Sequence, residues 1–297
     1  MNSAQQIKIG FIGFGEVASC FSEALVRNGA EVYAFDSKVL NEGGVELLQA
    51  RSRVHGIEFC DLPRLVSSVD IILSTVTSAS AVGAARSCLP YLDKRHTYVD
   101  LNSTSPAIKR EISEIVMPTG ASFLEGAILG AVRVFGAQTR VLLGGRTVHA
   151  FTALLQQYGI GAEALSEDIG RASSLKFLRS TFSKSCEAIL LETLMAAELA
   201  GLRDEVWSEI VLTFAGRGFQ AVAEAWITTH PDAHRRRLRE IGEVVEQIRE
   251  YGLTPIMTDS AYRFFERSEG ISFVATPRSV AGVVRSMARQ LKTRTPG

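Results

Sequence analysis

The pattern of apolar and polar positions divides the chain into two parts of different character. Up to about residue 165, short apolar runs rich in β-branched residues alternate with segments of helical periodicity. This alternation is typical of parallel strands joined by crossover helices, and it predicts an α/β fold with a doubly wound, mostly parallel sheet. The predicted strands are 7–12, 31–36, 57–59, 69–75, 97–100, 121–125 and 139–143, and the predicted helices are 16–27, 39–51, 79–87 and 106–116.

Beyond residue 165 the strand-like runs disappear and helical periodicity continues almost to the end. We therefore predict two domains, 1–165 and 166–297, the second of them all helical. Pro255 and Pro277 are expected in connections between helices, and the tail after Lys292 is expected to be mobile. The predicted helices of this part are 173–199, 204–214, 219–227, 235–251 and 260–267.

The first predicted strand leads directly into a glycine-rich turn, GFGEVA at 13–18, and then into a helix. Gly13 permits the tight turn, Gly15 has no side chain to hold a pyrophosphate away from the backbone, and Ala18 keeps the helix close to the sheet. Asp36 ends the next strand, about 20 residues further on, where a carboxylate accepts hydrogen bonds from the adenosine ribose. An ordinary strand, turn and helix with an incidental acid is the alternative, but the combination favours dinucleotide binding.

Composition narrows the choice of partners. The chain has 32 lysine and arginine residues against 32 aspartate and glutamate residues, so no net charge favours nucleic acid or an anionic membrane. Four widely separated cysteines indicate reduced, buried thiols. The N-terminus lacks the pattern of a signal peptide, and the uncharged stretch 71–85 is too short to span a bilayer. We expect a cytoplasmic protein that binds a small molecule and no metal.

A second chemical element lies on the long predicted helix. At 100° per residue, Lys176, Ser180, Ser183 and Glu187 fall within one narrow stripe. The stripe begins at the end of the helix nearest the first domain, where a partly desolvated lysine has a lowered pKa and serves as a general acid or base. From the periodicity alone, the solvated face of a surface helix is the more common explanation.

Five segments, in this order, resemble the β-hydroxyacid dehydrogenases related to 3-hydroxyisobutyrate and 6-phosphogluconate dehydrogenases: GFIGFGEVAS, VDIILSTVT, VDLNSTSP, FLEGAILGA and GRASSLKFLRS. The resemblance implies a Rossmann-type NAD(P)-binding domain followed by a helical domain that often forms a homodimer. It places the catalytic role on Lys176 and the substrate loop at Gly130. The lysine segment and HRRRLREI are similar to a subgroup whose C-terminal domain is uncharacterised.

The chain departs from the family pattern at two places. Leu129-Gly130-Ala131 stands where the family has a Ser-Gly-Gly that holds the substrate carboxylate. Arg179 and Ser180 stand where it has an asparagine near the lysine. Arg179 or the basic group 234–237 is a candidate for the lost anion contact, because arginine matches carboxylate and phosphate, although solvated helix charges explain these residues equally well.

These observations predict an NAD(P)-dependent oxidoreductase that acts on the CH–OH group of a small hydroxy acid or related alcohol, with Lys176 as general acid/base. NAD is expected because Asp36 would face a 2′-phosphate, while the nearby Lys38 keeps NADP as an alternative. An imine or other carbonyl reductase and a non-catalytic dinucleotide-binding sensor are the other candidates. The predicted substrate contacts are Asn102, Ser103, Gly130, Arg179 and Ser180. The predicted cofactor contacts are Gly13, Phe14, Gly15, Glu16, Val17, Asp36, Ser37, Thr75, Val76, Thr77, Asn102 and, by the resemblance, Arg239.

Overall fold

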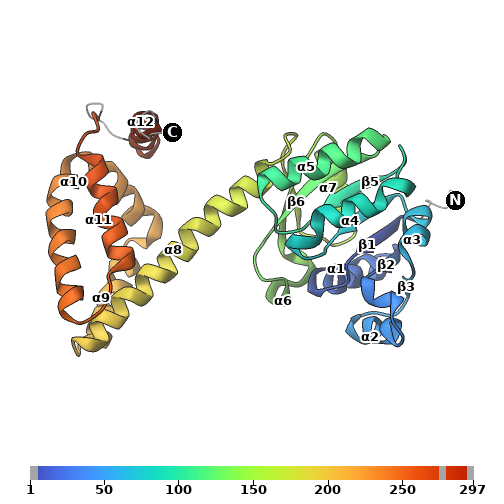
Figure 1. Cartoon of the computed structure of the whole chain (residues 1–297), viewed down its shortest axis with the longest axis horizontal. Helices are drawn as coiled ribbons and strands as arrows, with labels where there is room; N and C mark the ends of the chain where they lie inside the picture. The colour runs from blue at the N-terminus through green and yellow to red at the C-terminus, as the bar shows by residue number, and fades with distance from the viewer. Residues whose placement is uncertain (1–5, 274–278, 293–297) are drawn as a thin grey trace. The chain divides into compact units, whose positions relative to one another are not determined.

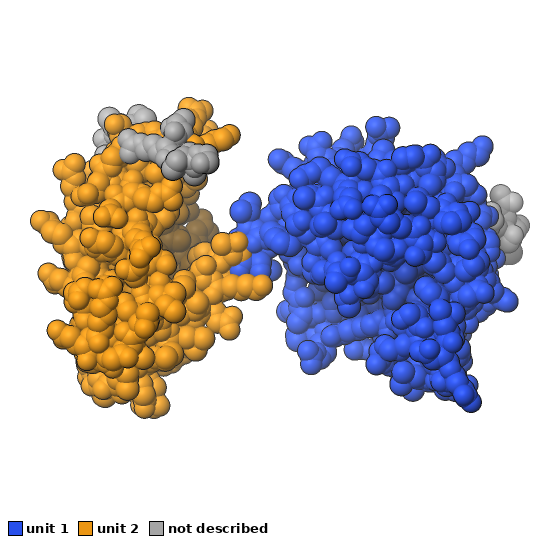
Figure 2. Space-filling view, viewed as in Figure 1, with its two compact units in different colours: residues 1–180 blue, residues 181–297 orange. Residues whose placement is uncertain are grey.

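A computed structural model describes residues 6–273 and 279–292. The chain forms two compact units, Met1–Ser180 and Thr181–Gly297 (Figure 2). Pro277 and the tail after Lys292, for which a connection and mobility are predicted, lie outside the described residues.

The first unit is built on a sheet with helices packed against it (Figure 1). The sheet has eight strands in the order β3-β2-β1-β4-β5-β6-β7-β8. Neighbouring strands are parallel except for the antiparallel pair of β6 and β7. The predicted doubly wound, mostly parallel sheet is therefore confirmed. The strands are β1 (Lys8–Ile12), β2 (Glu31–Phe35), β3 (Ile57–Phe59), β4 (Ile71–Ser74), β5 (Thr97–Asp100), β6 (Ser122–Leu129), β7 (Arg140–Gly144) and β8 (Ala162–Ser166).

Helices cover both faces of this sheet. Phe21 and Phe151 belong to a core between one face and the helices α1 and α7, while Leu65, Ala85 and Ile112 belong to a core between the other face and α3, α4 and α5. Each helix buries one apolar stripe against the sheet, as the crossover pattern requires. The helices are α1 (Glu16–Arg27), α2 (Gly44–Arg51), α3 (Leu62–Ser68), α4 (Ala81–Cys88), α5 (Pro106–Val116), α6 (Val132–Phe135) and α7 (Val148–Gln157).

The order of the strands reverses between β1 and β4. From β1 the chain builds outward to β2 and β3, and it then returns to the other side of β1 to form β4 and the strands beyond it. The backbone N–H of Thr75 donates to the carbonyl of Ile12 at 2.8 Å, so the loops after the two strands begin side by side. Ligands of doubly wound sheets bind at such a switch point, outside the carboxyl ends of the strands.

Some local predictions for the first unit were wrong. The helix predicted over 39–51 is interrupted by Gly43, whose φ of +70° lies in the left-handed region, and it becomes a 3-10 turn (Ser37–Leu40) followed by α2. Helices α3 and α7 and strand β8 were not predicted. Strand β8 has the sequence AEALS, which lacks the apolar run expected of a buried strand.

The second unit is helical throughout its described residues. One prediction here was wrong, because a single helix replaces the two expected at 219–227 and 235–251 and contains Pro231. Proline lacks the N–H that an interior helical position uses. Pro231 is nevertheless buried, and the rings of His230 and Phe265 lie 5.5 Å apart, so tertiary packing maintains the helix. The helices are α8 (Arg171–Leu199), α9 (Arg203–Ala215), α10 (Gly218–Glu250), α11 (Ile256–Ser268) and α12 (Val280–Lys292).

The two compact units divide inside α8, after Ser180. The domain boundary predicted near residue 165 lies at the end of β8 and stays a prediction. The first turns of α8 belong with the sheet because Ala172 is fully buried in a small cluster with Ala127 and Leu142. Residues 171–180 are therefore part of the first unit, although they begin a helix that continues into the second.

Two further expectations concern membranes and thiols. Within residues 6–273 and 279–292, no helix combines the length and the apolar character needed to cross a membrane. The cysteines are free, and Cys20, Cys60 and Cys88 are buried as predicted. Cys186 is exposed, so the prediction of a buried thiol was wrong there.

Candidate active site

The two glycines of the turn after β1 have different structural roles. Gly13 has a φ of +85°, and a Cβ added to it would lie 2.8 Å from Cγ1 of Val76 and 2.9 Å from the carbonyl oxygen of Thr75. Gly15 has a φ of −94°, and among the described residues no atom outside Gly15 and its neighbours in the chain lies within 4 Å of a Cβ added there. Gly13 is therefore required to form the turn, whereas Gly15 keeps space open beside the N-terminus of α1, where a phosphate group binds favourably.

Asp36, just after β2, holds the turn in place. Its Oδ2 accepts a hydrogen bond from the backbone N–H of Phe14 at 3.0 Å, and its Oδ1 accepts one from that of Lys38 at 3.1 Å. Burial, the largest single effect, raises the pKa of Asp36, but the two hydrogen bonds and the charges of Lys38 and Arg51 outweigh it and the pKa is lowered. The ionised carboxylate retains lone pairs for ribose hydroxyls.

A cavity of about 730 Å³ lies beside the turn and Asp36. Lys38 and Arg51 also line it, and they bring positive charge next to the carboxylate. The side chain of Phe14 is fully buried and packs edge-on against Phe59, so Phe14 shapes the turn through its backbone. The predicted cofactor contacts in the lining of this cavity are Gly13, Phe14, Gly15, Asp36, Ser37, Thr75, Val76 and Thr77.

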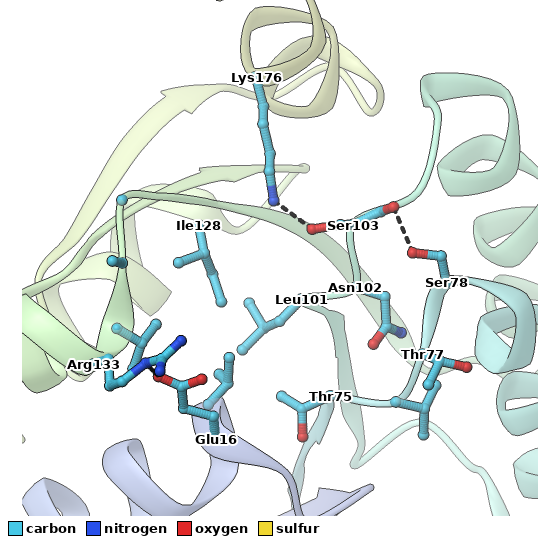
Figure 3. A pocket seen from close by; sticks show the side chains of 15 residues that line it. Glu16, Thr75, Thr77, Ser78, Leu101, Asn102, Ser103, Ile128, Arg133 and Lys176 are labelled. Atoms are coloured by element: carbon cyan, nitrogen blue, oxygen red, sulfur yellow. Dashed lines mark hydrogen bonds and ion pairs between the residues drawn. The ribbon is translucent and has the colours of Figure 1, made fainter. Parts of the chain in front are cut away.

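A second cavity, of about 540 Å³, shares the loop 75–77 with the first (Figure 3). The hydroxyl of Thr75 donates to the carbonyl of Gly13 at 2.7 Å and ties this loop to the glycine turn. Two cavities that share one loop at the switch point suit the two nucleoside halves of a dinucleotide. The predicted site residues in the lining of the second cavity are Glu16, Val17, Thr75, Val76, Thr77, Asn102, Ser103, Gly130 and Lys176.

Lys176 extends from α8 into the second cavity (Figure 3). Its Nζ donates a hydrogen bond to Oγ of Ser103 at 2.5 Å, and the carbonyl of Ser103 accepts one from the hydroxyl of Ser78 at 2.7 Å. Burial lowers the pKa of Lys176, and the positive charge of Lys109 lowers it further. The environment thus makes the neutral amine, the form that can accept a proton, easier to reach than in a solvated lysine.

Behind this cavity, the loop that carries Asn102 and Ser103 is fixed by a buried ion pair. Nζ of Lys109, on α5, lies 2.8 Å from Oδ2 of Asp100 and donates to the carbonyl of Asn102 at 2.8 Å. Asp100 in turn accepts hydrogen bonds from the backbone N–H and the side-chain amide of Asn102. Lys109 was not predicted as a site residue, although Asp100 at the end of an apolar strand was a signal that a cationic partner is needed nearby.

Asn102 offers one hydrogen-bond acceptor to the second cavity. Its Nδ2 donates to Oγ of Ser74 at 2.9 Å and to Asp100. Its Oδ1 is buried and has no hydrogen-bond partner among the described residues. Because a buried polar atom is normally paired, this oxygen fits a ligand donor such as the amide group of a nicotinamide.

Glu125, which is fully buried on β6, caps the helix that carries Lys176. Its Oε1 accepts hydrogen bonds from the backbone N–H groups of Gly170 at 2.6 Å and Ala172 at 2.9 Å. Its Oε2 accepts one from the hydroxyl of Ser173 at 2.7 Å. A carboxylate at this end of a helix satisfies N–H groups that lack a helical partner and interacts favourably with the helix dipole. The sheet therefore fixes the start of α8.

Three predicted contacts are absent from the described lining of both cavities. Arg179 and Ser180 lie about one turn beyond Lys176 on α8, and Arg239 is exposed on α10 in the second unit. The segment after Gly130 instead places Arg133 in the lining of the second cavity. Sequence reasoning missed Arg133 because the short helix α6 was not predicted.

Arg133 extends the site toward the glycine turn. Its Nε lies 3.5 Å from Oε1 of Glu16, and both side chains line the second cavity (Figure 3). The lining thus carries an amine, a guanidinium and one carboxylate.

Within the described ranges, no group of three or more His, Cys, Asp or Glu side chains is placed to hold a metal ion.

The fold and the two cavities define a dinucleotide-binding scaffold of the dehydrogenase and reductase class. The chain belongs to the family defined by the NAD binding domain of 6-phosphogluconate dehydrogenase, whose model matches residues 8–162. Residues 197–268 match a domain of unknown function, DUF1932. The predicted resemblance, including the uncharacterised C-terminal domain, is confirmed.

Individual relatives agree with this assignment. An uncharacterized 28.5 kDa protein of Methanothermus fervidus is 31% identical over 264 residues, which cover 89% of this chain and 99% of the relative. The 2-(hydroxymethyl)glutarate dehydrogenase of Eubacterium barkeri is 24% identical over 275 residues, covering 88% and 89%. An imine reductase from Myxococcus stipitatus, solved in complex with NADP+, shares the fold with a TM-score of 0.71 at 19% identity, covering 88% of this chain and 93% of its own.

Proposed function

We propose that this protein is an NAD(P)-dependent dehydrogenase that transfers hydride between a nicotinamide and the carbinol carbon of a small hydroxy acid or related alcohol. The observation that carries the proposal is the hydrogen bond from Lys176 to Ser103 inside the cavity that shares its loop with the dinucleotide turn. The bound cofactor supplies the hydride chemistry. The protein supplies the acid/base group and the orientation.

In the oxidation direction, the neutral amine of Lys176 would take the proton of the substrate hydroxyl, and a bound nicotinamide would supply the acceptor for the hydride from the same carbon. The amine becomes an ammonium, and the C–O bond of the substrate becomes a carbonyl. In the reduction direction, the ammonium returns its proton to the carbonyl oxygen. Ser103 positions the amine at 2.5 Å, and Oδ1 of Asn102, which is buried and unpaired among the described residues, would accept a hydrogen bond from the amide of the nicotinamide.

The position of Arg133 supports the proposal that the substrate is acidic. It lines the same cavity as Lys176, and a guanidinium matches a carboxylate in a bidentate geometry. A substrate carboxylate would take the place of Glu16 as the partner of Arg133, which restores an anion contact on the loop where the family's serine is missing. The activity in the name of the Eubacterium barkeri relative, on 2-(hydroxymethyl)glutarate, supports the same substrate class.

For the cofactor we infer a preference for NAD, because the carboxylate of Asp36 would face the 2′-phosphate of NADP. Lys38 and Arg51 in the same lining support NADP as the alternative.

We also propose a homodimer formed through the second unit. Large aromatic side chains there are about half exposed, with Phe182 and Phe219 at 53% and Trp226 at 50%, and a subunit interface would bury them.

Turnover of the wild-type protein and of Lys176→Met against small hydroxy acids, with NAD and with NADP, tests the proposal. We expect kcat/KM of the variant to fall by roughly 100-fold or more, the contribution of a general acid/base, while NADH affinity stays within about 3-fold. Activity of Lys176→Met within a few-fold of wild type would refute its role. A matched panel of cyclic imines covers the reductase alternative, and cofactor binding without turnover of either panel supports the sensor alternative.

A further inference from the structure

We propose that Lys109 is a positioning residue of the candidate active site, whose buried ammonium holds the Asn102–Ser103 loop and presents a fixed positive charge to Lys176. The inference rests on the proposed function in one respect, namely that Lys176 is the acid/base group. It otherwise depends only on the geometry of the first unit.

Oxygen atoms surround the amine of Lys109. Its Nζ donates to the carbonyls of Asp100 at 2.7 Å, Asn102 at 2.8 Å and Gly126 at 3.2 Å, and it lies 2.8 Å from the carboxylate of Asp100. The three carbonyls use the three N–H donors of an ammonium, since a neutral amine has only two, and the carboxylate of Asp100 balances its charge. The pKa of Lys109 is lowered because burial outweighs the opposing charge of Asp100, but the surrounding oxygen atoms are those that hold a charged group.

These contacts end on the backbone that carries the proposed chemistry. The carbonyl of Asn102 directly precedes Ser103, whose Oγ accepts the hydrogen bond from Lys176. The carbonyl of Gly126 directly follows Glu125, which caps the helix of Lys176. Lys109 therefore links β5, β6 and the loop into one rigid support for both partners of the Lys176–Ser103 hydrogen bond.

The second effect of Lys109 is electrostatic. Its charge is buried and fixed, so solvent screens it less than a surface charge. A like charge near an amine disfavours the ammonium form, and the pKa of Lys176 is lowered by burial and by Lys109. The other charged groups that line the cavity or pack at the start of α8 are Glu16, Asp100, Arg110, Glu125 and Arg133, with Arg171 and Arg179 on α8 itself.

The test is competitive labelling of lysines with trace acetic anhydride across a pH series, with the modification of each lysine measured by mass spectrometry on the full-length protein. The variants are Lys109→Met and the double variant Asp100→Asn/Lys109→Met, which leaves no unpaired buried carboxylate. The matched control is Lys8→Met, because Lys8 makes an exposed ion pair with Glu31 at the start of β1.

We expect the labelling midpoint of Lys176 to move to higher pH in Lys109→Met, with its labelling rate at pH 8 reduced roughly 3-fold or more, and to stay unchanged in Lys8→Met. The double variant also removes the negative charge of Asp100, so its midpoint should move less than that of Lys109→Met. An unchanged midpoint in folded Lys109→Met overturns the proposal. The wild type gives a second measurement that needs no variant: Lys109 should be the least reactive lysine, and labelling of Lys109 as fast as Lys8 overturns the proposal as well.

This experiment is independent of turnover. A shifted Lys176 midpoint in a protein that oxidises no hydroxy acid would support the role of Lys109 and count against the proposed function. An unshifted Lys176 midpoint together with loss of activity in Lys176→Met would count against the role of Lys109 and support the proposed function.

Discussion

The amine of Lys176 lies 2.5 Å from the hydroxyl oxygen of Ser103, although 73 positions separate the two residues in the chain. The loop after β5 and the first turns of α8 are held together around this contact by two buried charges, Lys109 and Glu125. A short hydrogen bond to a positioned amine fixes the direction in which the amine can exchange a proton.

Ser103→Ala should therefore lower kcat by about 10-fold, the upper end of the loss expected for one hydrogen bond, and leave NADH affinity unchanged. Steady-state kinetics with a hydroxy acid and fluorescence titration with NADH measure the two quantities. Ser67→Ala is the matched control, because the Ser67 hydroxyl donates to the carbonyl of Arg64 on the exposed side of its own helix, α3. A variant of Ser103 that loses NADH affinity at constant kcat would contradict this role.

The two glycines of the turn should respond differently to the same substitution. Gly13→Ala should lower the free energy of unfolding by about 1–3 kcal/mol, because it places a side chain at positive φ against Val76 and Thr75. Gly15→Ala should leave unfolding unchanged within about 0.5 kcal/mol and weaken NADH binding by roughly 10-fold or more, because its Cβ would occupy phosphate space. Chemical denaturation and NADH titration separate the effects, and Gly15→Ala with wild-type NADH affinity would count against a phosphate at this turn.

The site residues that could be predicted from the sequence are those that belong to local sequence patterns. The turn with Gly13 and Gly15, the acid Asp36 and the strand ends at Thr75 and Asn102 each follow an apolar run, and parallel strands bring their carboxyl ends to one edge. Lys176 was found partly by helical spacing and partly by resemblance. Its contact with Ser103 depends on how a helix begins relative to a distant loop, which no spacing encodes.

Two kinds of feature were not predicted. The first is buried charged residues, and the second is tertiary packing that overrides local helix propensity. Lys109 and Glu125 are 1% and 0% exposed, although patterning assigns charged residues to solvent. Pro231 predicts a break, yet α10 continues through it, with Pro231, His230 and His234 buried. Arg133 lies on a helix too short to show periodicity. Each of these depends on contacts between residues distant in sequence.

Glu125 offers a test of how much the cap of α8 contributes to stability. Glu125→Gln removes the charge and replaces one acceptor oxygen by a donor that faces Ser173, so we expect a loss of about 2–4 kcal/mol in the free energy of unfolding. Glu163→Gln is the matched control on β8, where the carboxylate pairs with Arg140 at an exposed site, and it should change stability by no more than about 1 kcal/mol. Equal losses in the two variants, measured by urea denaturation, would show that the cap contributes little.

A last prediction concerns the energetic consequence of holding Lys176 toward its neutral form. Its folded-state pKa lies below that of the unfolded chain, because burial and the charge of Lys109 disfavour the ammonium. The unfolded chain therefore binds more protons at this position, so the contribution of Lys176 to stability improves as the pH rises from the folded pKa to the unfolded pKa of about 10.4. Below the folded-state pKa, the full destabilising effect of the Lys176 ammonium is present. Above the unfolded-state pKa, this effect is absent.

Lys176→Met removes the titration and keeps the length of the side chain. It should raise the thermal unfolding midpoint at pH 7 by about 1–3 °C, and the advantage should shrink as the pH approaches 10. Calorimetry at several pH values checks the trend, with Lys8→Met as the control because Lys8 is in an exposed ion pair. A Met variant that is less stable than wild type at pH 7, or whose advantage grows with pH, would mean that the fold does not disfavour the ammonium of Lys176.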